Sequence, residues 1–324
     1  MLQAYQQILL ALIPVYFFIG AGFLFRRLGW LSEAADAALV KLQIRFFYPA
    51  LIFSFIFGNE ALRNPDLLIF PPLVGFLSVV CGFFVAYAIG KLSGFKPGKG
   101  LRTFAFTTGI YNYGFIPIPL IQAIYDSKSV TGTLMVHNTG IEVAIWTIGI
   151  LLLTGNLASG VWKKLLNPPL LAVVAGVLLN LLLPDLSSPA GLAGNSAATI
   201  IDAISWAGSC AIPLALILIG ASIRDLLRDP ELRIDWRVIS LGSGIRLALL
   251  PMVFISAAMA IPMPFELRAV MVIQAAMPSG MFPIILSRHY EGSPGVAVQV
   301  VLATTLLSFL TIPFWVAVGQ HLTS

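Results

Sequence analysis

The sequence has little charge, few cysteines and few histidines. Only 10% of its 324 residues are charged, against about 25% in an average soluble protein. Its two cysteines and three histidines are scattered along the chain, so they predict neither a disulfide framework nor a metal site. The chain also has no HExxH, phosphate-loop or GxSxG motif. We therefore expect no enzyme activity and no cofactor.

Apolar residues dominate what is present. They make up 58% of the chain, and the mean hydropathy is +0.94. A soluble domain could not bury so much apolar surface, so the composition excludes a disordered chain, a cytosolic enzyme and, despite the net charge of +5, a nucleic-acid binder. Long continuous apolar stretches also argue against a membrane β-barrel. The sequence predicts an all-α polytopic protein of the lipid bilayer.

Ten apolar stretches are long enough to cross a bilayer as helices, each of which needs about 20 residues. The odd-numbered connections between them carry 13 basic residues, beginning with Arg26 and Arg27, and the even-numbered connections carry 3. Because basic residues mark the cytoplasmic side, we expect both termini to be extracytoplasmic, in the cell (inner) membrane. The predicted spans are 8–25, 38–57, 67–90, 103–125, 133–154, 167–184, 203–223, 238–261, 265–287 and 296–319.

The chain divides into two halves of five helices that match in register. Pro49 matches Pro213, and Gly114 matches Gly280, at offsets of 164 and 166 residues. Five helices per half give the second copy the opposite orientation in the membrane, as in many secondary transporters. The sequence therefore predicts two inverted repeats, 1–157 and 167–324.

Glycine and proline cluster in the fourth and ninth predicted helices. Proline removes a backbone donor and clashes with the preceding turn, so each helix should break near mid-bilayer. The freed backbone groups then need partners in a water-filled cavity or a bound solute. Two readings are open, a kink between packed helices and a binding site, and the matching positions favour the site. The clusters are Gly109, Gly114, Pro117 and Pro119, and Pro278, Gly280 and Pro283.

Two charged residues lie deep in predicted spans. Glu142 is roughly 15 Å from the outer end of the fifth helix, where a charge is costly and usually functional. It either couples transport to a proton or pairs structurally with Arg246. Arg246 in turn either grips a substrate carboxylate with its forked guanidinium or snorkels to the cytoplasmic interface. Trp146, also mid-span, is expected to pack.

The predicted substrate site gathers small and polar residues at the two breaks. The amide of Asn112, just before the first break, can donate to a carboxylate. Half-helix N-termini at the second break would present N–H groups to an anion. The predicted substrate-binding residues are Asn112, Tyr113, Gly114, Pro117, Asn138, Gln274, Met277, Pro278, Ser279, Gly280, Thr304, Thr305 and Arg246, with Glu142 as the coupling residue.

Several stretches resemble the auxin efflux carrier family, which includes plant auxin carriers and bacterial malonate and malate permeases. The resemblance spans nearly the whole chain and is most specific near the C-terminus. The matching stretches are PALIF (Pro49–Phe53), Asn112, Gly114 and Phe115 with Pro119–Leu120, IPLALILIGASI (Ile212–Ile223), and QAAMPSG, SRHY and LATTLLSFLTIP between Gln274 and Pro313.

The resemblance implies a ten-helix fold similar to bile-acid sodium symporters. In that fold helices 1, 2, 6 and 7 form a scaffold that often dimerises, and helices 3–5 and 8–10 form a mobile transport domain. Helices 4 and 9 cross at their breaks, and the substrate moves beside the crossing by an elevator mechanism. The doubled proline of Ile116–Pro119 and the pair Phe282–Pro283 depart from the family pattern, so substrate and ion preferences are not carried over.

The resulting functional prediction is a bacterial-type permease for small organic anions such as malonate, malate or auxin-like acids. Coupling to a proton, a sodium ion or the membrane potential stays open. The main alternative is a membrane-embedded sensor that keeps the transporter fold. A channel is less suited to an inverted repeat with one deep carboxylate.

Overall fold

The structure, a computed structural model, describes residues 2–155, 167–182, 196–228 and 234–323. These ranges are helical, which confirms the prediction of an all-α protein. Within them the only extended pairing is an isolated antiparallel bridge between Tyr111 and Ser279. The repeat bounds predicted at 1, 157 and 324, and the end of the predicted span 167–184, lie outside the described residues.

Each predicted span contains helix, although residues 110–116 of the fourth and 277–281 of the ninth are not helical. Seven helical stretches in the described part of the chain are long and apolar enough, by length and composition, to cross a membrane. The shorter apolar helix α10 lies in the sixth predicted span, and the fourth and ninth are each split into two half-helices. The helices are α1 (Leu2–Leu28), α2 (Glu33–Leu42), α3 (Tyr48–Ile56), α4 (Asp66–Leu92), α5 (Lys99–Gly109), α6 (Pro117–Tyr125), α7 (Lys128–Ala144), α8 (Ile150–Thr154), α10 (Pro168–Leu182), α12 (Ser196–Ser209), α13 (Ala211–Arg228), α14 (Trp236–Gly244), α15 (Leu250–Ala260), α16 (Phe265–Ala276), α17 (Phe282–His289) and α18 (Pro294–Thr323).

In the described part of the chain, three π-helical turns join consecutive helices without interrupting them. Gln43–Phe47 joins α2 to α3, Ile145–Gly149 joins α7 to α8, and Ile245–Leu249 joins α14 to α15. Such turns are rare and occur frequently at functional sites. Here they contain Gln43, Trp146 and Arg246 respectively, of which Gln43 and Arg246 are buried.

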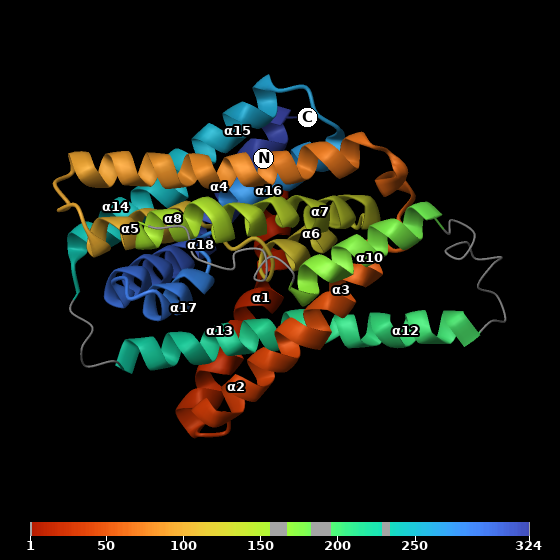
Figure 1. The fold of residues 1–324 in the computed structure, drawn as a ribbon, viewed down its shortest axis with the longest axis horizontal. Helices are drawn as coiled ribbons and strands as arrows, with labels where there is room; N and C mark the ends of the chain where they lie inside the picture. The colour runs from red at the N-terminus through yellow and green to blue at the C-terminus, as the bar shows by residue number, and fades with distance from the viewer. Residues whose placement is uncertain (1, 156–166, 183–195, 229–233, 324) are drawn as a thin grey trace.

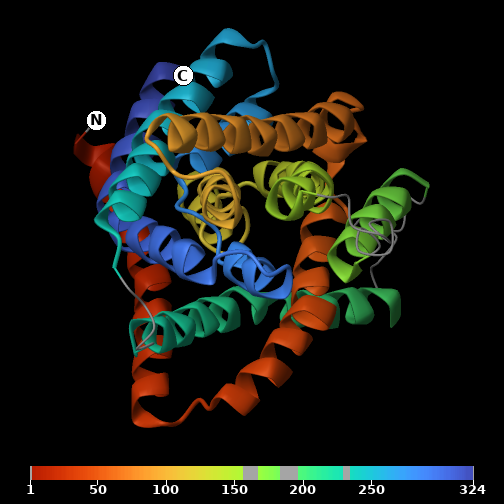
Figure 2. The same ribbon diagram turned by 60° about the vertical axis from the view of Figure 1, so that its left-hand side comes forward.

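The helices pack in two sets of neighbours. In one set α1 lies along α13, and α3 packs against α10 and α12. In the other set α4 packs on α5 and α7, while α18 contacts α5, α14 and α16. α4 and α13 lie at opposite sides of the bundle in both views (Figure 1 and Figure 2). The half-helices α5, α6, α16 and α17 lie between them.

Glycine allows α1 and α13 to approach backbone to backbone. A Cβ atom on Gly22 would collide with the carbonyl oxygen of Ile217, and one on Gly220 would collide with that of Ile19. The contact is therefore reciprocal, with one glycine on each helix. Small residues serve the same purpose at many helix interfaces in membranes, where close packing drives association.

Replacing Gly22 by alanine should destabilise the protein by about 1–3 kcal/mol, the usual cost of overpacking. The measurement is thermal unfolding of the detergent-solubilised protein, with size-exclusion chromatography to monitor how much folded protein remains at each temperature. Gly20→Ala is the matched control on the same helix, because no atom lies within 4 Å of its added Cβ. Equal thermal stability of the two variants would contradict the close contact.

Candidate functional site

The two breaks, residues 110–116 between α5 and α6 and residues 277–281 between α16 and α17, lie against each other at what we call the crossing. They satisfy each other's backbone groups. The Asn112 N–H donates to the Pro278 carbonyl at 2.7 Å, and the Gly280 N–H donates to the Ile110 carbonyl at 3.1 Å. Backbone groups inside a bilayer cannot turn to water for partners. Each break therefore depends on the other, which explains why the sequence carries both.

Asn112 holds the turn that leads into the half-helix α6. Its Oδ1 accepts from the backbone N–H of Phe115 at 3.2 Å and of Ile116 at 3.5 Å. The side chain is buried, yet it lines a cavity, and no described residue accepts a hydrogen bond from its Nδ2. A Cβ on Gly114 would stand 3.0 Å from the hydroxyl of Tyr48. The break thus holds one amide donor facing the cavity and a glycine that lets Tyr48 approach.

The Tyr113 carbonyl, freed by the same break, is held by two side-chain amides. Asn138 Nδ2 donates to it at 2.8 Å, and Gln274 Nε2 donates to it at 3.2 Å. Gln274 Nε2 also lies 3.2 Å from Asn138 Oδ1. This network ties α7 and α16 to the break between α5 and α6.

Glu142 is held by neutral donors. The Tyr113 hydroxyl donates to Oε1 at 2.6 Å, and Trp146 Nε1 donates to Oε2 at 3.1 Å. Among the described residues Glu142 forms no ion pair, so the predicted alternative of a structural pair with Arg246 is wrong. Trp146 does pack, with its ring 5.7 Å from that of Phe282, but its indole N–H also positions the carboxylate.

Arg246 lies behind the crossing and does not reach the interface. Its exposed fraction is 0%, so the prediction that it snorkels is wrong. Nη2 donates to the Ala275 carbonyl at 3.1 Å. The guanidinium carbon lies 5.2 Å and 5.5 Å from the ring centroids of Tyr111 and Phe254. Arg246 does not line the cavity, from which Tyr111 separates it.

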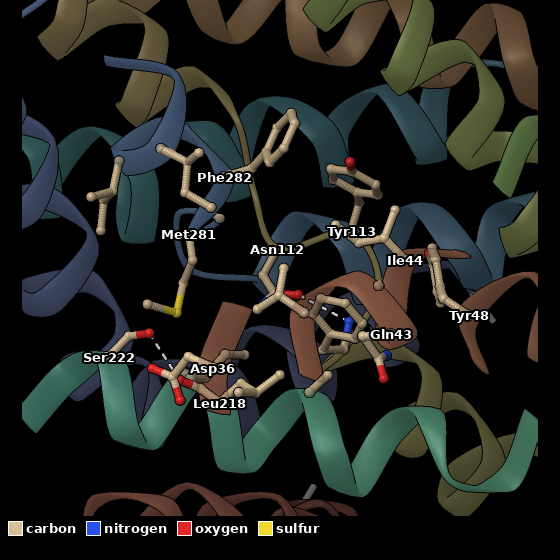
Figure 3. Close-up of a pocket in the computed structure, with 18 of the residues that line it drawn as sticks. Asp36, Gln43, Ile44, Tyr48, Asn112, Tyr113, Leu218, Ser222, Met281 and Phe282 are labelled. Atoms are coloured by element: carbon tan, nitrogen blue, oxygen red, sulfur yellow. Dashed lines mark hydrogen bonds between the residues drawn. The ribbon is translucent and has the colours of Figure 1, made fainter. Parts of the chain in front are cut away.

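A cavity of about 1020 Å³ runs from the crossing to the exposed side chain of Arg228. Asp36 and Tyr48 both line it and lie twelve residues apart on the continuous helix formed by α2 and α3, roughly 18 Å at 1.5 Å per residue. Figure 3 shows side chains from both breaks, from α2–α3 and from α13 facing this space. Those labelled are Asp36, Gln43, Ile44, Tyr48, Asn112, Tyr113, Leu218, Ser222, Met281 and Phe282.

The two ends of the cavity differ in charge. At the Arg228 end, Arg26 forms ion pairs with Asp36 and Asp225, the latter at 3.1 Å between Nε and Oδ1, which joins α1, α2 and α13. At the crossing, Glu142 is the ionisable acid among the described lining residues. The wall there is largely aromatic, with Tyr48, Tyr111, Tyr113, Phe115, Trp146 and Phe282.

The structure brings most of the predicted site residues to the crossing. Asn112, Tyr113, Gly114, Gly280 and Glu142 line the cavity. Asn138 lines a small adjoining pocket, and Gln274 reaches it through the hydrogen bonds given above. The others are buried beside the breaks: Met277, Pro278, Ser279 (whose N–H donates to Thr304 Oγ1 at 3.2 Å), Thr304, Thr305 and Pro117, the first residue of α6.

The sequence prediction missed the contributions of α2, α3 and α13. Gln43 donates through Nε2 to the Ala211 carbonyl at 2.8 Å and faces the cavity, as do Tyr48 and Ser222. Only Tyr48 had a sequence signal, because it precedes the matched Pro49. Met281 and Phe282 were also missed, although they directly follow the predicted break.

Comparison with known proteins gives two matches. A family model described as "Membrane transport protein" matches residues 7–161 and 156–316. The chain is also 27% identical over 299 residues to an uncharacterized transporter of Methanothermobacter thermautotrophicus. That match covers 91% of this chain and 92% of the relative.

Proposed function

We propose that this chain, which belongs to the membrane transport protein family of the auxin efflux carriers, moves small organic carboxylates across the cell membrane. It is a multi-pass membrane protein, and we propose that it acts as a secondary transporter or facilitator. The substrate classes suggested by the resemblance are malonate, malate and auxin-like acids.

One observation carries the proposal: donors without described acceptors meet in the cavity at the crossing. Asn112 Nδ2 faces this space, and α17 begins beside it at Phe282. The first N–H groups of a helix have no acceptor within the helix and lie at its positive dipole end. The N–H groups of Met281 and Phe282 are therefore suited to a carboxylate.

The packing supports an elevator mechanism. The predicted scaffold comprises α1, α2–α3, α10 and α12–α13, which contact one another extensively. The predicted transport domain comprises α4–α8 and α14–α18. The cavity is lined by both sets, so a shift of one set against the other would carry a bound substrate. Inverted repeats over 1–157 and 167–324, and a homodimer through the scaffold, stay predictions.

The test is uptake by purified protein in sealed liposomes. Radiolabelled malonate, malate and indole-3-acetate are compared under a proton gradient, a sodium gradient and a membrane potential alone. Saturable uptake of one of them would support the proposal, and the effective gradient would identify the coupling. Saturable binding without movement of any of them would instead favour the sensor.

The orientation is tested by labelling with a membrane-impermeant maleimide. In a background with Cys81 and Cys210 replaced by serine, Arg228→Cys should react only from the cytoplasmic face. Arg63→Cys, exposed on the loop before α4, should react only from the opposite face. We expect Arg228 on the cytoplasmic side because basic residues are in excess in the connections on that side of the membrane. Reaction of both variants from one face would refute the predicted orientation.

A further inference from the structure

Glu142 is a carboxylate in the cavity that no described base neutralises. Both of its described partners, the Tyr113 hydroxyl and the Trp146 indole, are neutral donors. It shares a small pocket with Tyr48, which lies roughly 18 Å along the α2–α3 helix from Asp36, the partner of Arg26. The basic lining residues lie on α1 and α13, towards the Arg228 end, and Arg26 is already paired.

Glu142 lies close to the donors proposed for the substrate carboxylate. Tyr113, which bonds Glu142, directly follows Asn112 in the chain. Trp146, its other partner, places its ring 5.7 Å from the ring of Phe282, the first residue of α17. A substrate carboxylate bound at Asn112 and α17 would thus be separated from the carboxylate of Glu142 by about the length of one aromatic side chain. Charges of the same sign at such a distance repel strongly inside a protein.

The surroundings of Glu142 suit an organic cation. Ammonium groups bind carboxylates through charge-assisted hydrogen bonds and also bind the faces of aromatic rings. Tyr113, Trp146 and Phe282 supply aromatic rings beside the carboxylate, and all three line the cavity. A proton on Glu142 would also remove the repulsion, but it would make no use of these rings.

We infer that the substrate is a zwitterion, an organic acid that carries an ammonium group. Its carboxylate binds Asn112 and the N-terminus of α17, and its ammonium binds Glu142 among the aromatic side chains. This inference rests on the proposed function and narrows its substrate class. It also gives Glu142 a role in substrate selection in place of the coupling role predicted from the sequence.

Two matched pairs of compounds test the inference in liposomes containing the wild-type protein. Phenylalanine is compared with 3-phenylpropionate, and 5-aminopentanoate with pentanoate, so that each pair differs only in the ammonium group. The two amino compounds differ from each other in the distance between their ammonium and carboxylate groups, so the two pairs test two charge separations. We expect uptake of the amino compound to exceed that of its partner by about tenfold or more in at least one pair, the usual effect of one charged hydrogen bond.

The variant Glu142→Gln should abolish this preference, because the amide keeps the shape of the side chain and loses its charge. Glu266→Gln is the matched control. Glu266 accepts from the Ser129 hydroxyl at 3.0 Å and does not line the cavity, so this variant should keep the preference. If Glu142→Gln does not fold, N-acetylated amino compounds serve instead, and they should fail to compete with the amino compounds in the wild type.

Several outcomes would overturn the inference. Equal or faster uptake of the deaminated acids, or their uptake driven by a proton gradient, would show that no ammonium is required, and carboxylate transport would still stand. A preference that survives in Glu142→Gln would remove Glu142 from substrate selection. Failure to transport any carboxylate, including malonate, malate and indole-3-acetate, would refute the proposed function and this inference together.

Discussion

Replacing Asn112 by aspartate should lower carboxylate uptake by about a hundredfold or more without unfolding the protein. Aspartate retains an acceptor for the N–H groups of Phe115 and Ile116, so the turn before α6 is kept. It replaces the Nδ2 donor that faces the cavity with a negatively charged oxygen. A like charge placed against a bound anion costs several kcal/mol, and each 1.4 kcal/mol is a factor of ten in affinity.

Uptake in liposomes and thermal unfolding in detergent separate the two roles of Asn112. Asn112→Ala loses the acceptor that holds this turn as well as the donor, so it should lose both uptake and stability, the latter by about 1 kcal/mol for the lost hydrogen bonding. Asn64→Asp makes the same chemical change at an exposed turn, where Oδ1 accepts from the Asp66 N–H at 3.0 Å, and should leave uptake unchanged. Normal uptake by Asn112→Asp would remove the crossing as the carboxylate site.

The position of the helices and of both breaks could be predicted from the sequence because these features are local. A bilayer demands long apolar helices, and clustered glycine and proline weaken a helix mid-span. Single prolines did not suffice, because Pro14 and Pro313 lie inside the continuous helices α1 and α18. Matching Gly114 with Gly280 then indicated that the two breaks belong together. The hydrogen bonds between Asn112 and Pro278, and between Gly280 and Ile110, are the structural form of that match.

The side-chain partners of the charged residues could not be predicted. Pairing depends on how each helix is rotated about its axis, and helices that are apolar all round give little indication of it. Glu142 and Arg246 were the obvious pair by charge, yet Glu142 bonds Tyr113 and Trp146 while Arg246 bonds a backbone carbonyl. Likewise, nothing in the sequence indicated that the turn between α2 and α3 and the helix α13 would bring Gln43 and Ser222 to the same cavity.

Replacing Arg246 by methionine should leave thermal stability unchanged or raise it, while lowering uptake by about tenfold. The guanidinium is fully buried, and in the described part of the chain its Nε and Nη1 have no hydrogen-bond partner. Removing a poorly compensated buried charge in favour of an apolar side chain is often neutral or stabilising. Stability alone therefore gives no reason for an arginine here, and a charge kept inside a membrane protein indicates function.

The position of Arg246 suggests which function it serves. It bonds Ala275 in the last turn of α16, where the helix dipole is negative, and it lies against Tyr111 in the opposite break. A positive charge there holds both half-helices at the crossing, and its loss should misplace the donors at Asn112 and α17. A misplaced donor weakens substrate binding by about the net worth of one hydrogen bond, up to about 1.5 kcal/mol, which sets the expected loss of uptake at about tenfold. Arg246→Lys keeps the charge and should recover most of the uptake. If Arg246→Met loses thermal stability in parallel with uptake, or if Arg246→Lys transports no better than Arg246→Met, the charge does not act in this way.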